Sequence, residues 1–173
     1  LAPNEAESTK LRKDAVFAIG VGTDPAAIGT LQSLYESDNA YEVKKQVIFA
    51  ASIHHEEAGS KNDEAGVNFL ITVAESNRDR TLKKEALFCL GQKAGQRALD
   101  ALGKTVETND ADTEVQKQAV FAISQRPKDE AVPLLIKIAR THAKPEVRKQ
   151  AIFWLGQTGD ERALQFFKEV LSK

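Results

Sequence analysis

One ten-residue phrase occurs five times in this chain, and this repetition constrains the fold more than any other feature of the sequence. The copies read LRKDAVFAIG from residue 11, VKKQVIFAAS from 43, LKKEALFCLG from 82, VQKQAVFAIS from 115 and VRKQAIFWLG from 147. Their shared Phe is Phe17, Phe49, Phe88, Phe121 and Phe153, at separations of 32, 39, 33 and 32 residues. A near-constant period of this length is typical of a solenoid, in which similar units stack on one another.

The phrase has the periodicity of a helix. If its first residue is numbered zero and each residue advances by about 100°, positions zero, four, five and eight lie on one apolar arc. A second apolar run follows every phrase, at residues 26–34, 67–74, 98–106, 132–139 and 163–171. Breaker and capping residues separate the two runs, most plainly at 20–25 and 156–160. Each unit is therefore predicted to be a helix, a tight turn and a second helix.

The fold class predicted from this pattern is all-α, a right-handed α-α superhelix of five two-helix repeats. A lone helical hairpin buries only part of its apolar surface, whereas stacked hairpins bury a continuous core. We expect one domain over residues 1–173, with repeats at approximately 10–36, 41–76, 80–107, 113–141 and 145–173.

The last repeat carries a family resemblance. Lys144-Pro145-Glu146-Val147-Arg148, followed by Ala151, Leu155-Gly156, Asp160, Ala163-Leu164 and Leu171, resembles the short bacterial HEAT-like repeat, including the phycobilisome-lyase type. The resemblance covers nearly the whole chain. It implies a non-catalytic interaction or scaffolding module whose partner is another protein or a peptide.

Charge and composition bear on which partners and environments the chain can have. The 24 basic and 25 acidic side chains nearly cancel, which makes nucleic acid an unfavoured partner. A weak nucleic-acid-binding solenoid is still an alternative, resting on the Lys at position two of every phrase. No run of apolar residues approaches the ~18 that a membrane span requires. The single cysteine, Cys89, excludes an intramolecular disulfide. None of these features indicates a compartment.

The candidate interaction surface combines the Phe and Lys of the phrase. Position six lies away from the apolar arc, and position two lies one turn before it on the same side. The residues are Lys13, Phe17, Lys45, Phe49, Lys84, Phe88, Lys117, Phe121, Lys149 and Phe153. In one interpretation they form an outer ladder that seats a partner, with weak cation–π contacts inside it. In the other, each Phe leans against the neighbouring repeat and is mostly buried under the Lys stem. We favour the second, because exposed rows of Phe are rare on monomers.

An enzyme is the second function class considered. HEAT-like deoxyhypusine hydroxylase holds iron with His-Glu pairs at positions two and three, where this chain has pairs such as Lys-Asp and Lys-Gln. Bilin lyases share the repeat, but no chromophore site is recognisable here. Cys89 lies within an apolar phrase and is interpreted as a core residue. We therefore predict no catalytic residue and no cofactor.

The second repeat contains an insert with the run His54-His55-Glu56-Glu57. Such residues ligate zinc or iron, but adjacent helical positions diverge by about 100°, and no second cluster completes a shell. We predict no metal here and interpret the run as a solvated helix end and loop.

The ends of the sequence lack the polar helices that cap most solenoids, since the last helix still carries Ala163-Leu164-Gln165-Phe166-Phe167. We expect either that the chain is part of a longer protein or that its ends meet another subunit. The first expectation is favoured, and a homo-oligomer formed through uncapped ends is the second.

Overall fold

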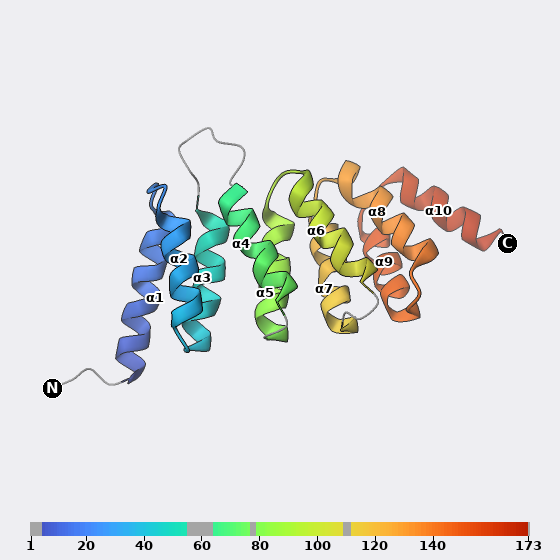
Figure 1. The fold of residues 1–173 in the computed structure, drawn as a ribbon. Helices are drawn as coiled ribbons and strands as arrows, with labels where there is room; N and C mark the ends of the chain where they lie inside the picture. Colours follow the sequence, from blue (N-terminus) through green and yellow to red (C-terminus); the bar gives the residue numbers. More distant parts are fainter. Residues whose placement is uncertain (1–4, 55–63, 77–78, 109–111, 173) are drawn as a thin grey trace. The chain divides into compact units, whose positions relative to one another are not determined.

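The structure is a computed structural model, and it describes residues 5–54, 64–76, 79–108 and 112–172. Over these residues the chain forms ten α-helices and no strand (Figure 1). The helices are α1 (Glu5–Val21), α2 (Ala27–Ser37), α3 (Tyr41–Ile53), α4 (Glu64–Glu75), α5 (Arg80–Gln92), α6 (Gln96–Glu107), α7 (Thr113–Ser124), α8 (Lys128–Thr141), α9 (Pro145–Gln157) and α10 (Glu161–Leu171). Each phrase lies in an odd-numbered helix and each second apolar run in an even-numbered one. The predicted all-α solenoid of helical hairpins is confirmed, whereas its right-handed twist stays a prediction.

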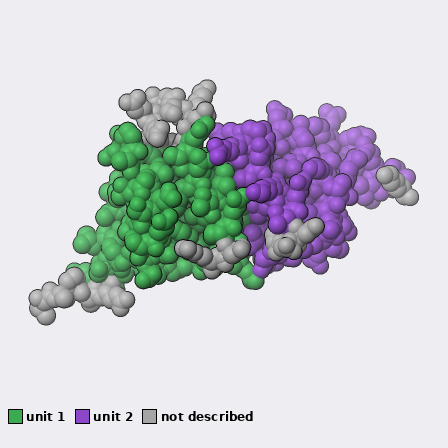
Figure 2. Space-filling model, in the orientation of Figure 1, with its two compact units in different colours: residues 1–89 green, residues 90–173 purple. Residues whose placement is uncertain are grey.

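The chain divides into two compact units, residues 1–89 and residues 90–173, with the boundary inside α5 (Figure 2). In the first unit α1 packs against α3, and α2 packs against α3 and α4. In the second unit α7 packs against α8 and α9, and α8 also contacts α10. First helices therefore neighbour first helices, and second helices neighbour second helices, within each unit.

The predicted apolar arc is the core in the three interior phrases. Positions zero, four, five and eight are all buried in α3, α5 and α7. The residues are Val43, Val47, Ile48, Ala51, Leu82, Ala86, Leu87, Leu90, Val115, Ala119, Val120 and Ile123. Because side chains of this kind gain free energy when they leave water, the arc fixes which side of each first helix faces the next hairpin.

The first helices approach one another closely at position nine. A Cβ added to Gly20 would lie 2.7 Å from the Cβ of Ala50, and one added to Gly91 would lie 2.8 Å from the carbonyl oxygen of Ala122. In both cases position nine of one phrase meets position seven of the next. A small residue at each position is what permits this spacing.

An aspartate precedes the first turn of many helices. Asp24, Asp38, Asp79, Asp112 and Asp160 each accept a hydrogen bond from the backbone N–H two residues later, at 2.7–2.9 Å. These bonds satisfy donors that have no partner inside the helix. They explain why hairpin turns and repeat links can be short and still start a helix at a defined residue.

Candidate interaction surfaces

The phrase Phe residues of the first unit are much more exposed than expected. Phe17 and Phe49 are each 46% exposed, and Phe88 is 41% exposed. They occupy the same phrase position on α1, α3 and α5. The favoured interpretation, that each Phe is mostly buried against its neighbour, is therefore wrong for this unit.

Two of the three phrase Lys residues of this unit bridge successive first helices. Lys13 Nζ lies 3.7 Å from Glu42 Oε2, and Lys45 Nζ lies 2.9 Å from Glu85 Oε1. The carboxylate of Glu85 accepts a hydrogen bond from Lys45 and raises the pKa of that ammonium. The ammonium groups of Lys13 and Lys45 therefore point toward acidic side chains, and the expectation that the Lys stems cover the Phe rings stays a prediction.

In the second unit, the Phe at the same phrase position has different surroundings. The ring of Phe121 on α7 lies 5.1 Å from the ring of Trp154 on α9, and Phe121 is half-buried. Trp154 also makes an edge-to-face contact with Phe153, at 5.0 Å between centroids. Phe153 itself is 54% exposed, so burial was wrongly predicted there as well. Lys117 pairs with Glu114 of its own helix at 3.0 Å, and Lys149 is exposed.

The residue at position seven of the following phrase accounts for this difference. It is Ala50 after Phe17 and Cys89 after Phe49, but Trp154 after Phe121. A small residue leaves the preceding Phe uncovered, whereas an indole reaches it. At Phe121 the covering ring comes from the next first helix.

The second helices form a groove that the sequence did not single out. It lies between α6 and α8, has a volume of about 590 Å³, and is floored by Leu99, Gly103, Pro133 and Leu134. On its rim, Lys137 Nζ lies 2.6 Å from Glu107 Oε1, and the neutral side chain of Gln96 donates to Asp100 at 2.6 Å.

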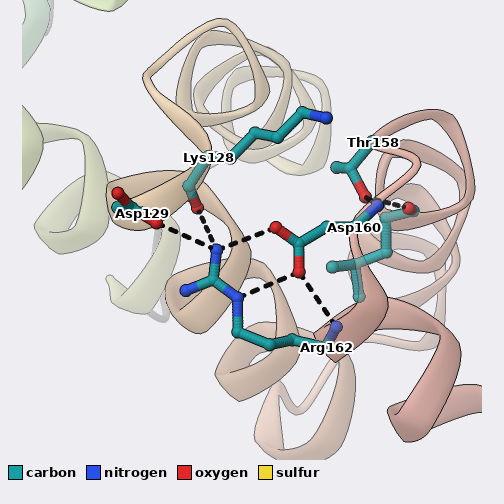
Figure 3. Close-up of polar contacts among 6 residues, drawn as sticks. Lys128, Asp129, Thr158, Asp160 and Arg162 are labelled. Atoms are coloured by element: carbon teal, nitrogen blue, oxygen red, sulfur yellow. Dashed lines mark hydrogen bonds and ion pairs between the residues drawn. The ribbon is translucent and has the colours of Figure 1, made fainter.

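A polar cluster positions the start of α10 against the start of α8 (Figure 3). The guanidinium of Arg162 donates to Asp160 through Nε and Nη2, both at 2.9 Å, and Nη2 also reaches the Lys128 carbonyl at 3.2 Å. Asp129 Oδ1 lies 3.3 Å from the same nitrogen. The hydrogen bonds from the side chain and backbone of Arg162 lower the pKa of Asp160 from 3.8 to about 2. The cluster links two hairpins, and its charged groups form hydrogen bonds and ion pairs with one another.

A second link of this kind buries a charged side chain. Arg126 is 5% exposed, donates to the Gly95 carbonyl at 3.0 Å, and pairs with Glu130 at 2.7 Å. Sequence reasoning missed both arginines. For Arg162 the available signal was Asp160 two residues before it, at the start of the last helix, whereas no comparable signal marks Arg126.

The residues considered for metal and catalysis do not assemble into a site in the part of the chain that the structure describes. No group of three potential ligand side chains gathers there. His54 follows the last residue of α3 and is fully buried, so its interpretation as a solvated helix end is wrong. His55, Glu56 and Glu57 lie outside the described residues, and the absence of a metal stays a prediction. Cys89 is buried, as expected of a core residue.

The comparison with family models agrees with the repeat assignment for the last two repeats. Residues 106–173 match the family model for HEAT repeats. Among solved structures, an engineered protein is 19% identical, with 99% of this chain and 91% of that chain covered at a TM-score of 0.45. The E. coli protein YibA is 18% identical, with 99% and 70% covered at a TM-score of 0.48. The comparison with curated proteins gives no match. None of the described helices combines the length and apolarity needed to cross a bilayer.

The family match and the internal repetition support each other. The match covers the last two copies of the phrase, and the three earlier copies form the first helices of hairpins of the same kind. Repeats of this type are often used as scaffolds for protein interaction. Residues 106–173 therefore match HEAT repeats, and the earlier hairpins are similar to them in sequence and helix order.

Proposed function

We propose that this chain is a non-catalytic protein-interaction module, and that the first-helix face of residues 1–89 receives an apolar segment of another protein or peptide. This face is named the Phe face and consists of Phe17, Phe49 and Phe88 with Lys13, Lys45 and Lys84. The observation that carries the proposal is the exposure of one Phe at the same position on each of three successive first helices, at 41–46%.

The exposed rings favour apolar contact over a charged ligand. A phenylalanine side chain that is nearly half exposed still has apolar surface in contact with water, and burying that surface is favourable. Three such side chains in a row form an apolar surface of the kind that marks interaction sites. Aromatic side chains are also enriched at the centres of protein interfaces. A partner that covers the three rings would recover this free energy.

The charges beside the rings limit the affinity for nucleic acid. Lys13 and Lys45 are neutralised in part by Glu42 and Glu85, which sit among the Phe positions on the same side. A phosphate backbone requires an excess of basic charge that these pairs remove. Protein or peptide is therefore the partner class that the Phe face fits.

The test places a photo-crosslinking phenylalanine analogue at position 49 and, in a separate protein, at the exposed position Ser33 on α2. Both proteins are irradiated in extract of the source cells and their adducts are identified. We expect discrete protein adducts at position 49 that position 33 does not give. The double variant Phe17→Ser and Phe88→Ser, carrying the analogue at 49, should lose them.

The matched control is a Gln32→Ala and Thr30→Ala double variant, which alters exposed polar residues of α2 and should leave the adducts unchanged. Circular dichroism confirms that both double variants are folded. Identical adducts from the Phe and control variants would contradict the proposal, as would adducts confined to position 33.

A further inference from the structure

The Phe face carries a second apolar row one helical turn beyond the phrase Phe. Val21 on α1 and Ile53 on α3 follow Phe17 and Phe49 by four residues, a separation that makes side chains neighbours on a helix. Val21 is 58% exposed and Ile53 is partly exposed. We name these two residues the second row. The apolar band across α1 and α3 is therefore two residues wide.

The spacing of the Phe follows from the spacing of the first helices. A Cβ added to Gly20 would lie 2.7 Å from the Cβ of Ala50, so α1 and α3 are in close contact. Ser52 and Cys89 occupy the same two phrase positions on α3 and α5 and are also small. Packed helices lie about 8–10 Å apart, and equivalent residues of successive first helices repeat at that interval. The Phe face thus presents an apolar contact about every 8–10 Å along a line that crosses the first helices.

This interval selects among the regular structures that a partner segment can adopt. Same-side residues of a β-strand recur every ~6.8 Å, which is too short, and the next same-side pair, at ~13 Å, is too long. A polyproline II segment repeats a side after three residues, or ~9.3 Å. An α-helix does so after seven residues, or ~10.5 Å, and a slight crossing angle shortens this projection to about 10 Å.

The width of the band separates the two remaining structures. The Phe row and the second row are about 5–6 Å apart, the separation of residues one turn apart on a helix. A polyproline II segment directs one residue in three toward a surface and covers a single row. An amphipathic helix has an apolar stripe about 100° wide on a cylinder about 10 Å across, which covers both rows.

A charged border runs along the other side of the Phe row. It consists of Lys13, Lys45 and Lys84 with Glu42 and Glu85, an excess of one positive charge. Complementary charges set the register of a partner and exclude wrong partners. Acidic residues are therefore the complement to this border.

We propose that the Phe face binds an amphipathic α-helix of another protein, which crosses α1, α3 and α5. Its apolar residues recur every seven positions, and its flank beside the phrase Lys is acidic. This rests on the proposed function and adds the secondary structure and charge of the partner.

Crosslinks from three positions of the Phe face measure the rise per residue of the partner. Three proteins carry the photo-crosslinking phenylalanine analogue at position 17, 49 or 88, and fragmentation mass spectrometry locates the labelled residue of the shared partner. Because two first-helix intervals separate positions 17 and 88, a helical partner should be labelled at residues about 14 apart, with the site for position 49 midway. A polyproline II or extended partner should be labelled at residues about six apart.

The second row has a test of its own. The double variant Val21→Ser and Ile53→Ser, with the analogue at position 49, should give about ten-fold fewer adducts, because a helix loses apolar contacts on both α1 and α3. The Thr30→Ala and Gln32→Ala control should keep the wild-type yield, and circular dichroism confirms that both proteins are folded. Undiminished adducts from the serine variant would overturn the helical partner, since only a narrow segment can bind without the second row.

The outcomes also separate this proposal from the function on which it rests. Labelled sites about seven and 14 residues apart, on a segment with an acidic flank, are the expected result. Sites about three and six residues apart would overturn the helix and leave the Phe face as a protein-binding surface. A basic flank on the labelled segment would overturn the charge of the partner. Absence of any adduct from position 49 would remove the proposed function, and the helical partner with it.

Discussion

The helices α1 and α9 carry the same phrase, yet they bury opposite sides of it. In α9 positions zero and four, Val147 and Ala151, are fully buried, and position five, Ile152, is exposed. In α1 positions zero and four, Leu11 and Ala15, are exposed, and position five, Val16, is fully buried. The phrase therefore encodes two packing sides. Which of them is filled depends on the hairpins present on each side.

This comparison separates two roles within the apolar arc. Position five faces the hairpin that follows, since it is buried where a following hairpin packs and exposed on α9. Positions zero and four face the preceding first helix, since they are exposed on α1, which has no preceding helix in the described residues. Variants at matched positions in α1 and α9 test this division directly.

The largest difference is expected at position four. Ala151→Asp buries a charge without a partner and should lower the free energy of unfolding by about 3 kcal/mol or more. Ala15→Asp makes the same chemical change on an exposed surface and should alter it by less than about 0.5 kcal/mol. Urea unfolding followed by circular dichroism, on dilute protein, measures both. Equal losses would show that position four does not distinguish the two sides.

Position nine gives the next contrast. Gly20→Ala places a methyl group 2.7–2.9 Å from the Cβ, Cα and carbonyl oxygen of Ala50, and should cost about 1–3 kcal/mol. Gly156→Ala meets open space and should stabilise the chain by about 0.4–1 kcal/mol, because alanine restricts the unfolded chain. Thermal unfolding of the two variants beside wild type would show opposite shifts. A loss of stability in Gly156→Ala would contradict the open face.

Position six contrasts a covered ring with an uncovered one. Phe121→Ala removes a half-buried ring that contacts Trp154 and should cost about 1–2 kcal/mol, below the 3–5 kcal/mol typical of fully buried Phe. Phe49→Ala should cost under about 1 kcal/mol, since the ring is nearly half exposed. A double-mutant cycle with Trp154→Ala should give a coupling of about 0.5–1.5 kcal/mol to Phe121. A coupling near zero would remove Trp154 as the reason for the burial of Phe121.

The fold could be predicted from the sequence because the local signals for helices agree with how the helices pack. The phrase repeats, its apolar positions follow a helical period, and aspartates mark the helix starts, so the hairpins were predictable from the residues alone. Their ends were less so: α4 begins at Glu64, three residues before the apolar run at Val67. Glu64, Ala65 and Gly66 carry no large apolar side chain, so hydrophobic periodicity does not mark this first turn.

The sequence predicted which residues make up the candidate surface but not how far their side chains are buried. The wheel placed the phrase Phe off the apolar arc, yet their exposure depends on position seven of the following helix, which is a contact between repeats. Trp154 differs from Ala50 and Cys89 at that position, and this difference was visible in the sequence. Its consequence for Phe121 required the spacing of α7 and α9. The links made by Arg126 and Arg162 join hairpins in the same way and were equally beyond a single-helix argument.

The smallest predicted effect concerns the acid sensitivity of the link between α8 and α10. The pKa of Asp160 is lower in the folded chain, about 2, than its ordinary 3.8, so ionised Asp160 stabilises the folded state. This contribution is fully present above about pH 3.8 and is lost as the pH falls toward 2. Asp160→Asn retains an oxygen that accepts from the Arg162 backbone N–H but removes the charge. The melting temperature of Asp160→Asn should therefore lie below that of wild type at neutral pH, and the two melting temperatures should converge as the pH falls through this window.

Two controls test whether the ion pair causes this gap between the melting temperatures. High salt should narrow the gap, because the ion pair is at the surface. In an Arg162→Gln background most of the pH dependence of the gap should vanish, since the guanidinium is the main cause of the lowered pKa of Asp160. A gap that is constant from neutral pH to pH 2, or that survives Arg162→Gln unchanged, would mean that the Asp160–Arg162 pair does not stabilise the last hairpin.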